Sequence, residues 1–472
     1  MAKNRREFLK LAGASSLGLA GAAVIARAHS VSAVESDGSN SDVVIIGGGF
    51  TGVTAARELS REGLKVVVVE ARDRLGGRTF TGRFGSHTTE FGGTWIHWAQ
   101  PHVWAEVTRY GLDIVETPVN AVQRVSWISG GKLRNASVEE TAPIIVSALK
   151  KYDNVDGADG MKLFPRPIDS TFSDEYRHYD GQSLTPRLKQ CGLTPDEEAL
   201  MNAWLTGECG NDPAVAGLVD QIRWYRLCDG SFEASNDRLI RYKLKSGTHA
   251  LIEAMIRDSK APCRLSTRVA KVEDTSAGVA VHTASGQTLR ARAAIVTVPM
   301  NTLDRIMFAP ALSPAKQAAA REKHANRSTK VWYQLKQPVG LWQGLAPWPN
   351  PISITFVDHE EPDGPVLVAF GPPGGMNVSD RESVQRAVRT LLPEAVVVKV
   401  AGHDWSADKF SDGAWCWYKP NQMTKYLKAL QTREGKLFFA SADSANGWRG
   451  FIDGAVESGL RAAREVLGAF RG

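Results

Sequence analysis

Ser41-Asp-Val-Val-Ile-Ile-Gly-Gly-Gly-Phe-Thr-Gly52 is the stretch that decides the fold. Val43 to Ile46 is a short β-branched run of the kind found in buried parallel strands. Gly47, Gly49 and Gly52 then give the G-x-G-x-x-G spacing. The first glycine permits a tight turn, the second lets the backbone approach a diphosphate, and the third allows close packing of the following helix, whose N-terminus favours an anion. The stretch predicts a Rossmann-like unit.

A second β-rich run supports dinucleotide binding. Lys65-Val-Val-Val-Val-Glu70 ends in an acid 21 residues after Gly49, where such a unit binds the ribose of its nucleotide. A glycine motif alone is also compatible with an ordinary glycine-rich turn. The order of strand, helix, strand and acid favours a dinucleotide, although it leaves both NAD and FAD open.

Length and composition describe a globular protein of more than one domain. The 472 residues exceed what one hydrophobic core usually organises. The hydrophobic content is 43% and the charged content 23%, as in ordinary soluble proteins. The net charge of +6 is concentrated in residues 1–33, which carry +4 and leave only +2 for the rest. We therefore expect no nucleic-acid partner.

Residues 1–33 are predicted to be a signal peptide rather than part of the fold. Asn4 to Lys10 is a charged region with paired arginines, Leu11 to Ile25 is apolar, and Val31-Ser-Ala33 resembles a cleavage site. The arginine pair resembles the twin-arginine export signal of bacteria, which predicts a periplasmic or exported protein and leaves 34–40 as a linker. The alternative is an uncleaved anchoring helix, but the apolar stretch is shorter than the roughly 20 residues that span a membrane.

Cysteine and histidine spacing gives no support for a metal site. The cysteines are odd in number and show no C-x-x-C pair, so neither a zinc site nor a disulfide framework is expected. One disulfide would be compatible with an oxidising compartment. The ten histidines form no H-E-x-x-H pattern. The five cysteines are Cys191, Cys209, Cys228, Cys263 and Cys416.

Two glycine-containing stretches follow the second strand. Ala71-Arg-Asp-Arg-Leu-Gly-Gly-Arg-Thr79 places Arg72 and Arg78 around a Gly-Gly turn, where they can reach phosphate oxygens; the alternative is a surface turn with solvated arginines. In Phe91-Gly-Gly-Thr-Trp-Ile-His-Trp98, the paired glycines beside tryptophans can let a flat ring lie against the backbone. His97 in that stretch is as compatible with a structural role as with a catalytic one.

These residues resemble a known family. Val68-Val-Glu-Ala-Arg-Asp-Arg-Leu-Gly-Gly-Arg-Thr79, followed by Phe91-Gly-Gly-Thr-Trp95, is similar to the FAD-binding segments of the flavin amine oxidases, the monoamine oxidase group. The likeness extends from about residue 41 to about residue 466. Within the group, Trp95 to Trp104 and Asn446-Gly-Trp448 most resemble the bacterial nicotine oxidoreductases and pseudooxynicotine amine oxidases.

The resemblance implies a mixed α/β fold in which a Rossmann-like FAD-binding domain is interleaved with a substrate domain. The FAD-binding domain is expected in 41–115, 246–319 and 408–466, and the substrate-binding domain in 116–245 and 320–407. Within the expected FAD-binding domain, Cys263 to Glu273 and Lys436 to Asp443 alternate like strands.

The resemblance also implies where FAD is held. The residue matching Val269 contacts the adenine end through its backbone, and Asp443 takes the place of a glutamate that is usual in mammalian members, which makes its ribityl or phosphate contact less secure. The helix that begins near Ile452 is expected to direct its N-terminus at flavin N1 and the C2 carbonyl. The full set of expected FAD contacts is Gly47, Gly49, Thr51, Gly52, Glu70, Ala71, Arg72, Gly77, Arg78, Gly92, Gly93, Thr94, Trp95, Val269, Asp443 and Ile452.

Three residues are expected to take part in catalysis. Lys330 matches the family lysine that holds a water near flavin N5, although an isolated lysine is more often solvated. Trp415 and Phe451 match the two walls of an aromatic cage in front of the flavin. Ala414 stands where the mammalian enzymes have the cysteine that bonds covalently to FAD, so non-covalent FAD is expected.

The resemblance implies oxidation of an aryl-alkyl or nicotine-related amine by hydride transfer to flavin N5, giving an imine that hydrolyses. The electrons then pass to oxygen or to a periplasmic carrier such as cytochrome c. An L-amino-acid or polyamine oxidase is an alternative enzyme, and a non-catalytic flavoprotein or electron relay is an alternative of another class. A homodimer is compatible with the sequence, and a stable membrane span and a metal are not expected.

Overall fold

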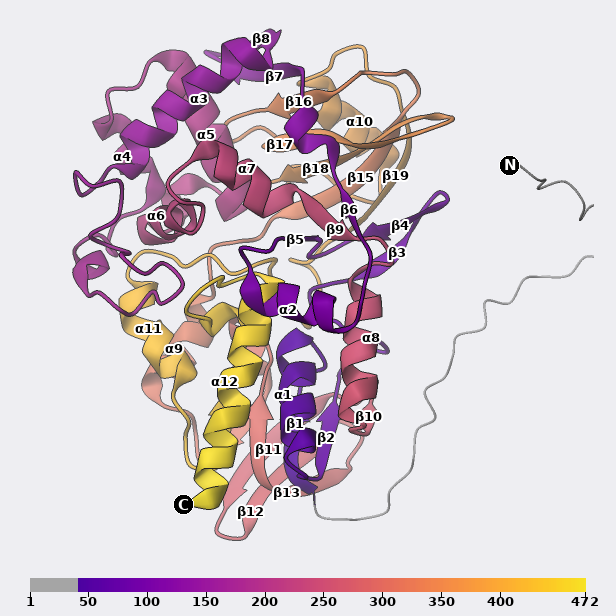
Figure 1. Cartoon of the computed structure of the whole chain (residues 1–472), viewed down its shortest axis with the longest axis vertical. Helices are drawn as coiled ribbons and strands as arrows, with labels where there is room; N and C mark the ends of the chain where they lie inside the picture. Colours follow the sequence, from indigo (N-terminus) through magenta and orange to yellow (C-terminus); the bar gives the residue numbers. More distant parts are fainter. Residues whose placement is uncertain (1–40) are drawn as a thin grey trace, which may run out of the picture. The chain divides into compact units, whose positions relative to one another are not determined.

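The computed structural model describes residues 41–472. The predicted signal peptide 1–33 and linker 34–40 lie outside the described residues. Two large β-sheets organise the described chain, and helices cover them (Figure 1).

The first sheet has eight strands, with the opening stretch at its centre. β1 (Ser41–Ile46) pairs in parallel with β2 (Val66–Val69) on one side and β13 (Thr288–Val296) on the other. Its last four residues are buried, as the β-branched run predicts. The strand order is β10-β2-β1-β13-β12-β11-β14, with β20 also on β13. The other strands are β10 (Cys263–Arg264), β11 (Val269–Thr275), β12 (Gly278–Thr283), β14 (Met307–Ala309) and β20 (Leu437–Phe439).

Three helices lie along this sheet: α1 (Phe50–Arg61), α8 (Thr248–Ser259) and α12 (Ile452–Arg471) (Figure 1). α1 packs between the other two. The contact with α12 is close because Gly459 has no side chain: a Cβ there would lie 2.5 Å from the carbonyl oxygen of Thr51. Gly52 likewise lets α1 approach β1, since its Cβ would lie 2.0 Å from the carbonyl oxygen of Gly47. The predicted packing role of Gly52 is confirmed.

The second sheet has seven strands in the order β19-β15-β18-β17-β16-β7-β8. Six helices accompany this sheet, and those at 138–153, 195–209 and 381–389 contact its strands. The strands are β7 (Arg124–Ser129), β8 (Lys132–Ser137), β15 (Thr329–Leu335), β16 (Trp342–Leu345), β17 (Ile354–Glu361), β18 (Gly364–Gly371) and β19 (Val397–His403). The helices are α3 (Val138–Asp153), α4 (Leu184–Gln190), α5 (Pro195–Cys209), α6 (Leu218–Leu227), α7 (Phe232–Ile240) and α10 (Arg381–Arg389).

Smaller elements complete the fold. A hairpin and a three-stranded sheet with the order β5-β9-β6 accompany the two large sheets. These elements are β3 (Thr81–Phe84), β4 (His87–Glu90), β5 (Trp95–Ile96), β6 (Ile114–Glu116), β9 (Tyr242–Leu244), α2 (Pro101–Arg109), α9 (Pro314–Glu322) and α11 (Gln422–Gln431). The 3-10 helices are η1 (Pro118–Ala121), η2 (Glu175–His178), η3 (Pro213–Val215), η4 (Met300–Arg305) and η5 (Ala442–Ser444).

All strands of the eight-stranded sheet come from the segments expected to bind FAD, and all strands of the seven-stranded sheet from the segments expected to bind substrate. The domain boundaries themselves stay a prediction. Two expected strands are shorter than the alternation indicates. The run from Cys263 to Glu273 is interrupted at Ser266, whose φ of 51° breaks the extended backbone, and β20 ends at Phe439 before Asp443.

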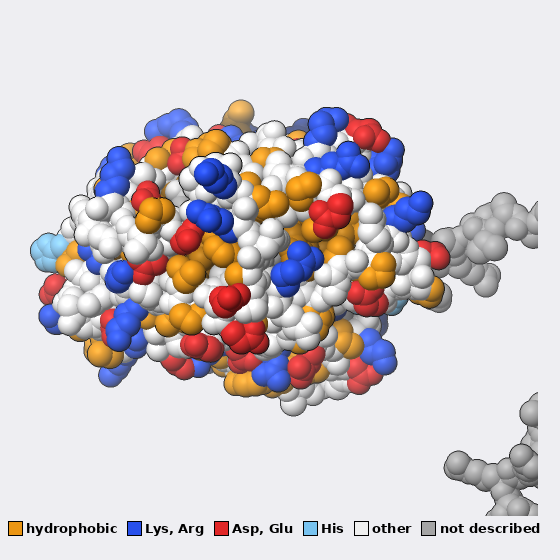
Figure 2. All heavy atoms as spheres, turned by 90° about the horizontal axis from the view of Figure 1, so that it is seen from above, with side chains coloured by type: hydrophobic (Ala, Val, Ile, Leu, Met, Phe, Trp, Pro, Cys, Tyr) orange, Lys and Arg blue, Asp and Glu red, His pale blue; other side chains and the backbone are white. Residues whose placement is uncertain are grey.

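Surface charge on the described residues is mixed. Figure 2 shows a face on which Lys and Arg side chains alternate with Asp and Glu, with apolar side chains between them. Within residues 41–472, no helix combines the length and the apolar character needed to cross a membrane.

Candidate active site

A cavity of about 550 Å³ is lined by residues from both large sheets and their helices. Of the residues expected to bind FAD or take part in catalysis, only Gly52 and Asp443 do not line it. Those that do are Gly47, Gly49, Thr51, Glu70, Ala71, Arg72, Gly77, Arg78, Gly92, Gly93, Thr94, Trp95, Val269, Lys330, Trp415, Phe451 and Ile452. We call the part of the cavity lined by residues 204–240, 354–370, 415 and 451 the substrate end.

The N-terminus of α1 faces the cavity without a side-chain cap. Its N-cap residue is Gly49, and its first turn holds no acidic residue. The first N–H groups of a helix lack partners within the helix, and the helix dipole adds partial positive charge there. A Cβ on Gly77 would lie 3.4 Å from the Cα of Gly49, so two bare backbones approach each other beside this helix end. The arrangement suits a diphosphate.

Glu70 links the glycine turn to the segment after β2. Its Oε2 accepts a hydrogen bond of 2.7 Å from the backbone N–H of Gly48, and its Oε1 accepts one of 2.9 Å from that of Arg72. The side chain is buried but lines the cavity. Each carboxylate oxygen retains acceptor capacity for a ligand hydroxyl.

Both arginines expected at the phosphates are held by carboxylates. Arg72 donates to Asp408 at 2.7 Å and to Ser411 at 2.8 Å. Arg78 donates to the carbonyl oxygen of Ala414 at 2.8 Å and to Asp443. The arginines are therefore oriented toward the cavity wall rather than solvated as in a plain surface turn.

Asp443 acts from behind this wall. It is fully buried and does not line the cavity. Its Oδ1 accepts from Arg78, and its Oδ2 accepts from the backbone N–H of Met300 at 2.8 Å. The structure thus gives Asp443 a positioning contact with Arg78 in place of the expected direct contact with the cofactor.

The two glycines of the Phe91–Trp95 stretch have different surroundings. A Cβ on Gly92 would lie 2.2 Å from the carbonyl oxygen of Arg78 and 2.7 Å from the ring of Trp405. Packing within the protein therefore requires glycine there. Gly93 is exposed, and a Cβ on it would meet only side-chain carbons of Thr79 and Ile452 at 3.2 Å or more. Of the two, only Gly93 leaves room for the expected ring.

Lys330 lies on β15 with its ammonium between protein acceptors. Its Nζ donates to the carbonyl oxygens of Glu90 (2.9 Å) and Gly92 (3.0 Å) and to Oγ1 of Thr94 (2.5 Å). The Trp95 ring centroid is 4.7 Å away. Burial lowers the pKa of Lys330 to about 7, against the opposing effect of the Glu90 carboxylate. Since these contacts use all three donors of an ammonium, holding a water would require one of them to be released.

Trp415 and Phe451 are held by separate sets of neighbours. The indole Nε1 of Trp415 donates a hydrogen bond of 2.8 Å to the carbonyl oxygen of Glu208, and its ring meets Phe370 edge-on at 6.0 Å. Phe451 packs against the Trp224 ring at 4.8 Å. Both side chains line the cavity.

No cysteine or histidine lines this cavity in the described chain. Ala414 does line it, whereas the nearby thiol of Cys416 is fully buried outside the lining. Burial also raises the pKa of Cys416 well above its usual value, which disfavours a reactive thiolate. All five cysteines are free.

Other tryptophans were harder to place from sequence. Of Trp95, Trp98, Trp417 and Trp448, only Trp95 lines the cavity. Trp98 is half exposed, and Trp417 and Trp448 are buried outside the lining. The structure adds Trp204, Trp224 and Trp405 to the lining. His97 is buried outside the lining, 2.9 Å from Asp237, which favours its structural role.

Glu208 is the residue that sequence reasoning missed. It occupies the last turn of α5, a helix that starts at a Thr194–Glu197 capping box and stops at Gly210, whose φ is 63°. The side chain lines the substrate end, and its Oε2 has no hydrogen-bond partner. A signal was present in the sequence: an acid in the last helical turn opposes the helix dipole, so it is an unusual placement.

Within residues 41–472, one group of side chains has the spacing of metal ligands: His87, His359 and Glu361. None of the three lines the cavity. This group therefore lies apart from the cofactor and substrate positions.

Comparison with known proteins identifies the family. A family model described as flavin containing amine oxidoreductase matches residues 50–467. The chain belongs to this family. A model described as pyridine nucleotide-disulphide oxidoreductase also matches residues 8–91, which include β1, the glycine turn and β2.

Relatives of this flavin amine oxidoreductase cover most of its length. Pseudooxynicotine dehydrogenase from Pseudomonas sp is 41% identical over 437 residues, which cover 91% of this chain and 87% of that protein. Nicotine dehydrogenase from Pseudomonas putida (strain DSM 28022 / S16) is 37% identical over 471 residues, which cover 98% and 97%. The expected likeness to this branch of the family is confirmed.

Solved structures share the fold of this amine oxidoreductase. A redesigned putrescine oxidase superposes with a TM-score of 0.77 at 21% identity, covering 91% of this chain and 99% of that one. Cyclohexylamine oxidase from Brevibacterium oxydans IH-35A gives 0.74 at 20% identity, covering 92% and 100%. The mixed α/β fold with a Rossmann-like domain is confirmed.

FAD is the cofactor of this amine oxidoreductase, and the described residues fit it. The uncapped α1 N-terminus, the facing glycine backbones and two arginines suit its diphosphate, and Glu70 suits its ribose. The N-terminus of α12 also lines the cavity and has no side-chain cap. There its dipole can stabilise negative charge on a flavin ring.

Proposed function

We propose that this flavin amine oxidoreductase oxidises an aryl-alkyl or nicotine-related amine at a carbon–nitrogen bond, giving an imine that hydrolyses. The observation that carries the proposal is the composition of the substrate end, where tryptophan and phenylalanine rings predominate. These rings belong to Trp204, Trp224, Phe356, Phe370, Trp415 and Phe451. The names of the two similar proteins, a pseudooxynicotine and a nicotine dehydrogenase, support an aromatic amine.

The chain's own residues position the substrate and exclude water. Bound FAD supplies the acceptor for the hydride equivalent that leaves the substrate carbon. Trp415 and Phe451 are assigned as the walls of an aromatic cage for the amine, which enters as an ammonium attracted to the ring faces and must lose its proton before oxidation. Orientation of this kind contributes to the rate without any acid–base dyad.

The polar groups of the substrate end argue against an L-amino-acid oxidase. Such an enzyme needs a cation for the substrate carboxylate. Among the described residues, Lys330 is the cation that lies beside a ring of the substrate end, that of Phe370. Its Nζ already donates to three protein acceptors. No arginine belongs to the substrate-end segments of the lining as described.

The FAD is assigned as non-covalent. Ala414 replaces the cysteine of the mammalian enzymes, and no cysteine lines the described cavity. Acid denaturation followed by removal of the protein is expected to leave all flavin in solution. Flavin that stays with the precipitate would contradict the assignment.

Export through the twin-arginine pathway is part of the proposal because the paired arginines, the apolar stretch and the small residues stand in the order of such a signal. The electrons then pass to oxygen or to a periplasmic carrier such as cytochrome c. Reoxidation of the reduced protein by each acceptor separates the two. The mass of the holoenzyme in solution tests for the homodimer with which the sequence is compatible.

The proposal is tested by mixing the holoenzyme anaerobically with nicotine, pseudooxynicotine, phenethylamine and phenylalanine. The flavin absorbance is expected to bleach with at least one of the first two and not with phenylalanine. Equal bleaching by phenylalanine and phenethylamine would favour an amino-acid oxidase. A flavin that no amine bleaches would overturn the enzyme assignment and favour an electron relay.

A further inference from the structure

The cavity lining, and its substrate end in particular, contains polar atoms that protein partners leave unsatisfied. The indole Nε1 atoms of Trp95 and Trp224 and the Oε2 atom of Glu208 have no hydrogen-bond partner although they are buried. All three side chains line the cavity. Buried polar atoms are nearly always paired in folded proteins, so an unpaired set facing one cavity indicates a ligand that completes it.

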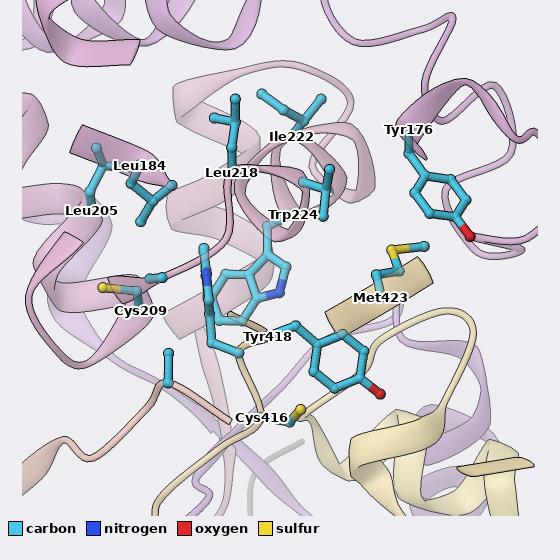
Figure 3. Packing of buried hydrophobic residues seen from close by; sticks show 14 of the residues in the cluster. Tyr176, Leu184, Leu205, Cys209, Leu218, Ile222, Trp224, Cys416, Tyr418 and Met423 are labelled. Carbon is cyan, nitrogen blue, oxygen red and sulfur yellow. The ribbon is translucent and has the colours of Figure 1, made fainter. Parts of the chain in front are cut away.

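Two of these residues lie next to the walls of the assigned cage. Figure 3 shows the Trp224 indole within the buried cluster, with Cys209 at the end of α5 on one side and Tyr418 on the other. Glu208 directly precedes Cys209, and its backbone carbonyl accepts the hydrogen bond from Trp415 at 2.8 Å. Glu208 is therefore next to Trp415, one wall of the assigned cage. Trp224 packs against Phe451, the other wall.

The Glu208 carboxyl has the surroundings of a neutral acid. Burial raises its pKa well above the usual value, and the neighbouring Asp153 raises it further, against the weaker effects of Trp204 and Gln221. Asp153 is itself fully buried with a raised pKa, and Gln221 donates to it at 3.4 Å. The end of the α5 dipole adds to the cost of negative charge. A neutral carboxyl carries an O–H donor.

We propose that Glu208 and Trp224 form a hydrogen-bond donor subsite, which holds an acceptor atom on the end of the amine remote from the reacting carbon–nitrogen bond. A pyridine nitrogen or a ketone oxygen is the acceptor of suitable chemistry. An indole N–H can only donate, so a ligand that itself offers only donors cannot satisfy it. This inference rests on the proposed function and narrows its substrates to aromatic amines that carry such an acceptor.

A second ammonium is the competing ligand for Glu208, as in a diamine or polyamine. That ligand would need the ionised carboxylate, which the burial and the helix end disfavour. It would also leave the Trp224 N–H unpaired. An acceptor atom requires a neutral Glu208, whereas an ammonium requires an ionised one. Substitutions of Glu208 therefore distinguish the two ligands.

The first test measures how tightly unreactive ligands bind to the FAD-loaded protein, and the change in flavin absorbance reports the binding. The ligands are 3-propylpyridine and propylbenzene, which differ in a single acceptor atom. We expect the pyridine to bind about tenfold to a hundredfold more tightly. Equal affinities would overturn the subsite whether or not any amine is oxidised.

Substitutions assign the preference to its residues. Glu208→Leu and Trp224→Phe are each expected to reduce the pyridine preference about tenfold, whereas Glu208→Gln retains a donor and most of the preference. Glu198→Gln, at an exposed position of the same helix, is the matched control and should change nothing. If Glu208→Leu does not fold, the glutamine and phenylalanine variants decide. Putrescine, a diamine, tests the competing ligand. If the wild type oxidises putrescine and Glu208→Gln loses both this oxidation and the pyridine preference, Glu208 binds an ammonium and the donor subsite is overturned.

The second test compares reduction of the flavin by nicotine and by 1-methyl-2-phenylpyrrolidine, its phenyl analogue. We expect kcat/KM to favour nicotine by the same factor as binding, with the preference lost in Glu208→Leu. Equal rates for the pair overturn the subsite while the proposed function stands. If neither amine reduces the flavin, the proposed function fails. The relative affinities of 3-propylpyridine and propylbenzene still test the subsite in that case.

Discussion

Asp443 forms a buried ion pair with Arg78, a residue 365 positions earlier in the chain. The carboxylate is fully buried, whereas the guanidinium lines the cavity. The Arg78 cation lowers the pKa of Asp443 against the opposing effect of burial. Through this pair the last strand–helix connection sets the position of an arginine that we assign to the FAD diphosphate.

Asp443→Asn is expected to weaken FAD binding. The amide keeps the shape of the side chain and loses the charge, so Arg78 is no longer fixed toward the diphosphate. We predict a rise of about tenfold in the Kd for FAD, which corresponds to about 1.4 kcal/mol. Titration of the apoprotein with FAD measures it, and Asp443→Glu, which keeps the charge, is the control. An unchanged Kd in Asp443→Asn would contradict the positioning role.

Trp415 has two separable contributions, its ring and its hydrogen bond to Glu208. Trp415→Phe retains an aromatic wall and removes the hydrogen bond, whose loss is expected to cost about 1 kcal/mol, or about fivefold in kcat/KM. Trp415→Ala removes both the ring and the hydrogen bond, and its kcat/KM is expected to be at least tenfold lower than that of Trp415→Phe. Steady-state kinetics on the best amine measures both variants. Unchanged turnover in Trp415→Ala would remove this residue from the cage.

Lys330 predicts a pH-dependent stability. Its pKa is lowered to about 7 in the folded protein and is about 10.4 in an unfolded chain. Between these values the unfolded state binds more protons, so a rising pH stabilises the folded state. The difference in Tm between the FAD-saturated wild type and Lys330→Met should therefore shift in favour of the wild type from pH 7 to pH 9. A constant or opposite difference would show that Lys330 stays charged.

Asp220 is predicted to be essential for stability. Its Oδ1 accepts from Arg223 at 3.2 Å and from Arg449, and all three side chains are fully buried. Asp220→Asn leaves two buried guanidinium groups without a counter-charge, which typically costs about 3–5 kcal/mol. The exposed pair of Asp174 and Arg177 gives the control: Asp174→Asn should cost about 1 kcal/mol or less. Thermal unfolding compares them, and equal Tm values for the two variants would contradict the prediction.

The sequence predicts the cofactor half of the site better than the substrate half, for a physical reason. A diphosphate needs glycines, a helix start and an acid at fixed spacing, and Gly47, Gly49 and Glu70 are close in the chain. The substrate end instead depends on which helix faces pack against the second sheet. Trp204, Glu208 and Trp224 lie on α5 and α6, and no spacing in the sequence shows that they face one cavity until those helices are placed.

Two other expectations changed for similar reasons. Asp443 has the right spacing for a cofactor contact, but β20 ends early and a 3-10 helix turns its carboxylate toward Arg78 and Met300. Lys330 and Trp332 lie on the same strand, β15, and both donate to the carbonyl oxygen of Glu90. Its commitment to three protein acceptors depends on a turn more than 200 residues away in the chain, which alternation alone does not reveal.

The proposed function and the donor subsite together make this chain a flavin enzyme for an aromatic amine that carries a hydrogen-bond acceptor. The most direct measurement is the anaerobic rate at which nicotine and pseudooxynicotine bleach the bound flavin, beside the rate for phenylalanine. We predict rapid and complete bleaching by at least one of the two pyridine amines and none by phenylalanine. A flavin that stays oxidised with both pyridine amines, or that phenylalanine bleaches as fast, would contradict the account.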